Sequence, residues 1–111
     1  MKRLLETIKD HLQKASNPLF FFDDDPDGAC AFLLLHKFCG TGKGITTKAG
    51  PILDVDSLRK CEEYQPDLVV ILDKAIVSQE FLDGVKCPKI WIDHHPLLKR
   101  DNVIYFNPKM F

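Results

Sequence analysis

The amino-acid sequence predicts an α/β fold, in which a parallel, doubly wound sheet carries helices on both of its faces. Short uninterrupted apolar runs, such as Leu68–Leu72, alternate along the chain with segments whose apolar residues recur at helical spacing. The runs lack the apolar–polar alternation of a sheet that faces water on one side, and this is typical of buried parallel strands. With 111 residues, the chain is expected to form one small domain.

The first half of the chain is predicted to contain two helices and two strands. An amphipathic helix that ends near residues 16–18 is indicated by apolar residues at helical spacing: Leu4, Leu5, Ile8, Leu12 and Ala15. The run 19–22 is too short and too continuous for a helix, so it is expected to be a strand. Asp27-Gly28 opens a second helix over 29–38. The glycine-rich segment 40–44 ends that helix and leads into a strand over 45–47.

The second half is predicted to repeat this alternation. Asp54 or Asp56 caps a third helix that runs to about Tyr64, and Ser78 is the expected N-cap of a short fourth helix. Three further strands are expected, over 68–72, 90–92 and 103–106. Strands that alternate with helices in this way favour a parallel sheet covered on both faces.

Composition narrows the classes of function. The formal net charge is -1, so the chain has no global basic field, and a polyanion would have to bind through local patches and bound metals. The four cysteines lie far apart without a CxxC pair, which argues against a zinc site or a disulfide framework and favours a reducing cytoplasm. The charged N-terminus is not a signal peptide, and no apolar run approaches the roughly 20 residues that span a bilayer.

Three predicted strands end in residues that bind metals. The run 20–22 leads into a segment with four carboxylates in five residues, 23–27, while Leu68–Leu72 leads into Asp73 and the run 90–92 leads into 93–95 (Asp-His-His). The C-terminal ends of parallel strands share one edge of a sheet, where such folds place ligands. Carboxylates packed together repel one another unless cations lie between them, and oxygen and imidazole ligands suit Mn²⁺ or Mg²⁺. The sequence therefore predicts a metal site with two ions.

The acidic segment also has a purely structural interpretation, because aspartate favours the first turn of a helix. One aspartate suffices for a cap, however, and four would repel one another without a counter-ion. Alternation along an extended segment places Asp23, Asp25 and Asp27 on one side and Asp24 on the other. Gly28 would let either the backbone or a substrate phosphate approach closely.

Asp73, taken alone, would be an ordinary strand-end residue, and the two histidines could be ordinary loop residues. Adjacent residues do not easily share one face of a strand, so His94 and His95 are expected to have different roles. One would bind metal through a neutral imidazole and the other would contact substrate phosphate. Asp93 would either orient a ring or act as a ligand itself. Arg100 belongs to a small basic group beyond the histidines that could contact a nucleic-acid backbone.

In this order, the motifs resemble those of the DHH family of phosphoesterases, and in particular its RecJ-like branch. Asp23-x-Asp25-x-Asp27-Gly28 is similar to the first family motif, Asp73 to the second and 93–95 to the third, while Asn107-Pro108 is similar to a segment that follows the third. The resemblance implies a Mn²⁺-dependent phosphodiesterase with two metal ions. It makes Asp25, Asp27, Asp73 and His94 metal ligands and His95 a phosphate contact. Asp23 stands where many archaeal relatives carry a histidine.

The chain also departs from the family pattern. It contains neither the fourth metal-binding motif nor the C-terminal substrate-binding domain, and Lys74 stands where relatives carry a small or apolar residue. The expected function is hydrolysis of single-stranded nucleic acid or short oligonucleotides, completed by a second polypeptide or by a homo-oligomer. The main alternative is a catalytically inactive, DHH-like binding subunit of a replication or repair complex, and a split enzyme is a third.

Overall fold

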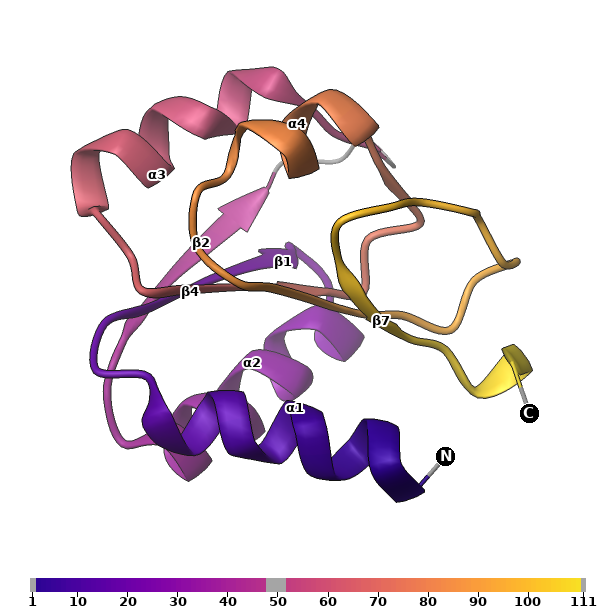
Figure 1. Cartoon of the computed structure of the whole chain (residues 1–111), viewed down its shortest axis with the longest axis horizontal. Coiled ribbons are helices and arrows are strands. Elements are labelled where there is room, and N and C mark those ends of the chain that lie inside the picture. The colour runs from indigo at the N-terminus through magenta and orange to yellow at the C-terminus, as the bar shows by residue number, and fades with distance from the viewer. Residues whose placement is uncertain (1, 48–51, 111) are drawn as a thin grey trace.

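The computed structural model describes residues 2–47 and 52–110, and it confirms the predicted α/β fold with a parallel sheet (Figure 1). Five parallel strands lie in the order β2-β1-β4-β6-β7. Their bounds are Pro18–Asp23 (β1), Lys43–Thr47 (β2), Leu68–Leu72 (β4), Lys89–Ile92 (β6) and Ile104–Phe106 (β7). The helices are α1 (Lys2–Lys14), α2 (Pro26–Cys39), α3 (Leu58–Tyr64) and α4 (Gln79–Gly84), with short 3-10 turns η1 (Val55–Ser57) and η2 (Pro108–Met110).

Helices cover both faces of the sheet, with α1 and α2 on one side and α3 and α4 on the other (Figure 1). Leu12 of α1 and Phe32 of α2 pack with Phe20 and Val70 on the first face. Phe81 of α4 packs with other buried side chains of the sheet on the second face. Every side chain of β4 is buried because this strand lies in the middle of the sheet, which explains its unbroken apolar sequence.

The structure refines several predicted boundaries. Helix α2 begins at Pro26, three residues earlier than predicted, because proline is favoured in the first turn and Asp25 provides the N-cap. Strand β2 begins at Lys43 instead of Ile45. A second, two-stranded parallel sheet was not predicted: it pairs β3 (Ile52–Leu53) with β5 (Ile76–Val77). Strands of two residues are too short to leave a periodic pattern in a sequence.

Strand register brings the three site segments to one edge of the sheet. Phe22 of β1 pairs with Leu72 of β4, and Leu72 pairs with Ile92 of β6. The next residue along each of these three neighbouring strands therefore lies at the same height along the sheet edge. Asp23, Asp73 and Asp93 lie at these positions, as the sequence predicts.

Within the described ranges, no helix has both the length and the apolar character needed to cross a bilayer. Strand β7 forms one edge of the five-stranded sheet, and its three side chains are half-buried.

Candidate metal centre

Two groups of potential metal ligands meet at Asp73. The first joins Asp73 with His94 and His95, and the second joins Asp73 with Asp23 and Asp25. In each group, the ligand atoms all lie within 4.8 Å of one another, a spacing that one ion can bridge. Asp73 is buried and common to both groups, so it is the centre of the arrangement.

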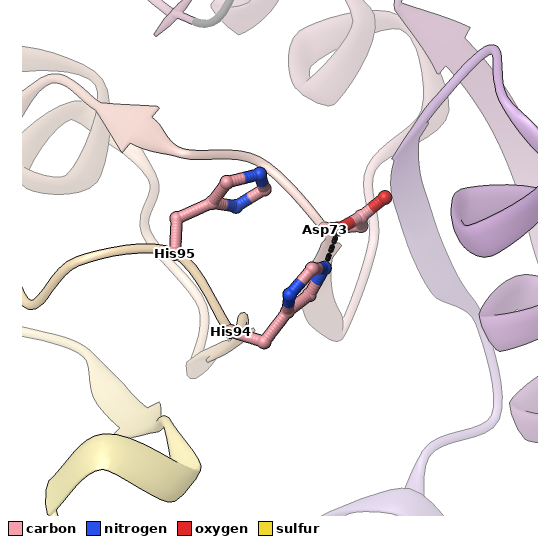
Figure 2. Close-up of side chains that lie close together, drawn as sticks. All are labelled: Asp73, His94 and His95. Carbon is pink, nitrogen blue, oxygen red and sulfur yellow. Dashed lines mark hydrogen bonds and ion pairs between the residues drawn. The ribbon is translucent and has the colours of Figure 1, made fainter.

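The imidazole of His94 contacts the central carboxylate directly. Its Nε2 lies 2.8 Å from Oδ1 of Asp73, and Figure 2 shows the ring pointing toward that carboxylate. The rings of His94 and His95 stack with their centroids 4.6 Å apart. The expectation that these neighbours do not easily share one face assumed that both lie on a strand. Strand β6 ends at Ile92, so the two histidines lie in a loop to which strand alternation does not apply.

Asp93 orients His95. Its carboxylate accepts one hydrogen bond from the His95 ring at Nδ1, over 2.5 Å, and another from the His95 backbone N–H, over 3.2 Å. The first of these bonds raises the pKa of His95 above its ordinary value. Partial burial opposes this, and the negative charges of Asp93, Asp73 and Asp23 add to the increase. Asp93 itself is buried, and both of its oxygens are engaged by His95. Of its two predicted roles, the arrangement favours orientation of a ring.

The backbone of Asp73 is held in an unusual conformation. Its φ is 59°, in the left-handed region that few residues other than glycine adopt, although aspartate is one of the more tolerant. Its N–H donates to the carbonyl of Ile92, which ties the end of β4 to β6. Burial raises the pKa of Asp73, the nearby carboxylate of Asp25 raises it further, and the hydrogen bond with His94 lowers it. This carboxylate is therefore costly to ionise in the absence of a cation.

The acidic segment divides between the cluster and the helix. Oδ1 of Asp25 caps α2 by accepting a hydrogen bond from the Gly28 N–H over 2.7 Å, while its carboxylate also belongs to the cluster. The expected alternation fails at Asp27, because α2 has already begun and the segment is no longer extended there. Among the described residues, neither ligand group includes Asp27. It is exposed and lines a groove beside Asp73 and His94.

Two residues expected to contact substrate, Gly28 and Arg100, also have structural contacts. A Cβ on Gly28 would lie 2.4 Å from the carbonyl oxygen of Asp23, so glycine is required where α2 crosses the end of β1. Its N–H is used by the Asp25 cap. Arg100 donates from Nε to the carbonyl of Val77 in β5 and from Nη1 to the carbonyl of Lys99. Both contacts hold the loop that follows the histidines.

Lys74 brings a positive charge into the cluster. Its side chain is fully buried, and its Nζ lies 2.7 Å from Oδ1 of Asp23. The same carboxylate oxygen accepts a hydrogen bond from Oγ1 of Thr47 over 3.2 Å. The sequence did not predict the Thr47 contact. It follows from the pairing of β1 with β2, which places Thr47 opposite Asp23.

Asn107, which directly follows β7, supports the loop that carries the histidines. Its buried amide donates from Nδ2 to the carbonyl of His95 over 2.7 Å, and its Oδ1 accepts from the N–H of Lys109. In the sequence, only the motif resemblance pointed to Asn107. Its hydrogen bonds give it a structural role, because they hold the backbone of His95 in place.

The donor set suits a hard divalent cation. Carboxylate oxygens supply most of the ligands and one or two imidazoles the rest, which is the chemistry of Mn²⁺ and Mg²⁺ sites. The pKa of Asp73 is raised first by burial and then by the negative charge of Asp25, and a bound cation would offset both effects. In comparisons with known proteins, no protein-family model and no curated protein matches the chain.

Proposed function

We propose that this chain is a metal-dependent phosphoesterase domain that hydrolyses phosphodiester bonds in single-stranded nucleic acid or short oligonucleotides. The observation that carries the proposal is the position of Asp73, a buried carboxylate shared by two groups of closely spaced ligands at the edge of a parallel sheet. Ligands of open α/β sheets bind at this edge. The resemblance of the three motifs to the DHH family, and to RecJ-like members in particular, supports the same reaction.

Each residue of the centre has a part in the proposed chemistry. A bound Mn²⁺ or Mg²⁺ would stabilise charge on the phosphoryl oxygens and lower the pKa of a water molecule. Asp73, Asp25 and His94 would hold the cation through two carboxylates and one ring nitrogen. Asp93 fixes the His95 ring through Nδ1, which leaves Nε2 to donate to a phosphate oxygen. The raised pKa of His95 favours the charged ring that a phosphate binds best.

In the proposed hydrolysis, a water oxygen attacks phosphorus and the bond from phosphorus to the leaving oxygen breaks. The proton of that water passes to the leaving oxygen or to solvent, and no covalent bond to the protein forms. A groove of about 450 Å³ runs beside the centre and gives the substrate room next to the reacting phosphate. It is lined by the ligands Asp73 and His94 and by apolar side chains that include Ile92 and Phe106, a mixture that suits a nucleoside with its phosphate.

A second candidate function is that of an inactive binding subunit of a replication or repair complex. Lys74 favours it, because a buried ammonium beside Asp23 compensates part of the acidic charge without any metal. We further propose that a second polypeptide or a second copy of the chain completes the functional unit. The position of β7 at an edge of the sheet, with half-buried apolar side chains, supports such a contact.

Turnover of a labelled single-stranded oligonucleotide with Mn²⁺ separates these functions. The proposal predicts cleavage by the parent protein, alone or with an added partner chain, and a loss of at least 100-fold in Asp73→Asn. Asp24→Asn is the matched control, because Asp24 is an exposed carboxylate of the same acidic segment that neither ligand group includes. If the parent protein binds Mn²⁺ but cleaves no oligonucleotide, either alone or with a partner chain, the function of an inactive binding subunit would be favoured.

A further inference from the structure

Lys74 is a lysine that the fold places inside an acidic cluster. Lysine is almost never fully buried unless it is paired, and the Lys74 side chain has no exposed surface. Its Nζ contacts Oδ1 of Asp23 over 2.7 Å. Asp23 belongs to the same ligand group as Asp25 and Asp73. The ammonium therefore stands beside carboxylates that would otherwise bind a cation.

The main chain fixes Lys74 in this position. Asp73 adopts the left-handed conformation immediately before it, which turns the chain as it leaves β4. The indole Nε1 of the buried Trp91 then donates to the carbonyl of Lys74 over 2.9 Å. Trp91 in turn stacks on Tyr105, with ring centroids 4.2 Å apart. Because the lysine backbone is anchored on both sides, the ammonium is a built-in part of the cluster.

The oxygen that Lys74 contacts is already engaged by protein donors. Oδ1 of Asp23 accepts from Lys74 Nζ over 2.7 Å. Thr47 Oγ1 lies 3.2 Å from this oxygen and equally far from the carbonyl oxygen of Phe22, so its one proton is shared between the two acceptors. A divalent ion bound to this oxygen would have to displace the ammonium, and an ion bound to the other oxygen of Asp23 would still approach a positive charge. The Asp73 oxygen that faces His94 contacts an imidazole nitrogen, over 2.8 Å.

We propose that Lys74 takes the place of one of two cations, so that the centre holds a single divalent ion on Asp73, Asp25 and His94. The inference rests on the proposed function and deepens it. It replaces the two ions implied by the motif resemblance with one ion and one ammonium. Lys74 thus acts as a specificity-determining residue, because it sets how many metal ions the carboxylates accept.

The test is to count bound Mn²⁺ per chain by titration of the metal-free protein, with free Mn²⁺ read by electron paramagnetic resonance. The parent protein should bind one ion and Lys74→Met two, with a larger Mn²⁺-induced rise in melting temperature for the variant. Lys89→Met is the matched control, because Lys89 is another buried lysine, whose Nζ donates to the carbonyl of Val85. It should bind one ion, as the parent does.

A double variant guards against loss of folding in Lys74→Met. Asp23→Asn combined with Lys74→Met removes both charges of the pair and should bind one ion. Two ions in the parent protein would overturn the inference and leave the proposed function standing. One ion in a folded Lys74→Met would also overturn it. A parent protein that binds no Mn²⁺ would overturn the proposed function and the inference together.

Discussion

The carboxylate of Asp93 accepts hydrogen bonds from both the ring and the backbone N–H of His95, two residues further along the chain. The ring bond keeps a proton on Nδ1 and fixes the plane of the imidazole. A ring held in this way is pre-organised, because its remaining nitrogen has a set direction. The pair therefore links the buried end of β6 to the half-exposed surface where substrate would bind.

The Asp93–His95 pair predicts a pH dependence in the metal-free protein. The pKa of His95 is raised on folding, so its contribution to stability is fully present below the unfolded value of about 6.5 and is lost as pH rises through the folded pKa. Asp93→Asn should lower the His95 pKa measured by NMR titration. It should cost on the order of 1 kcal/mol at pH 6, and less above the folded pKa. An unchanged His95 pKa in the variant would contradict this relationship.

Asp73→Asn should stabilise the metal-free protein and remove metal binding. Burial and Asp25 make the charged form of Asp73 costly, asparagine tolerates the left-handed backbone, and its amide oxygen can still accept from His94. We expect a gain on the order of 1 kcal/mol in the free energy of unfolding without metal, measured by urea denaturation. We also expect no rise in melting temperature with millimolar Mn²⁺. A variant less stable than the parent would show that repulsion at Asp73 is unimportant.

Gly28→Ala should destabilise the fold, because the new Cβ would lie 2.4 Å from the carbonyl oxygen of Asp23 and force α2 away from β1. We expect a loss of about 2–3 kcal/mol in chemical denaturation. Gly40→Ala is the control. Alanine at position 40 would be strained by the φ of +75°, but its Cβ would meet nothing within 4 Å. We therefore expect this variant to lose only about 1 kcal/mol in the free energy of unfolding. Equal losses would argue against a tight crossing at Gly28.

The sequence predicts the strands of the large sheet well, because runs such as Leu68–Leu72 are buried on both faces and therefore uninterrupted. It also brings the candidate ligands to one edge of the sheet, because parallel strands in register end together. It does not predict the course of the chain beyond the strand ends. The left-handed backbone of Asp73, which precedes the buried Lys74, leaves no periodic signal. The stacked histidines were missed for the same reason. The helical position of Asp27 did have a local signal, namely the Asp25 cap and a proline in the first turn.

The central claim is that Asp73 and its neighbours bind a divalent cation. Crystals of the protein grown with Mn²⁺, with an anomalous difference map recorded at the manganese edge, test it most directly. The predicted result is a peak within about 2–2.5 Å of a carboxylate oxygen of Asp73 and Nε2 of His94, which replaces their present hydrogen bond. No peak at Asp73, or a peak only on exposed carboxylates such as Asp24, would contradict the claim.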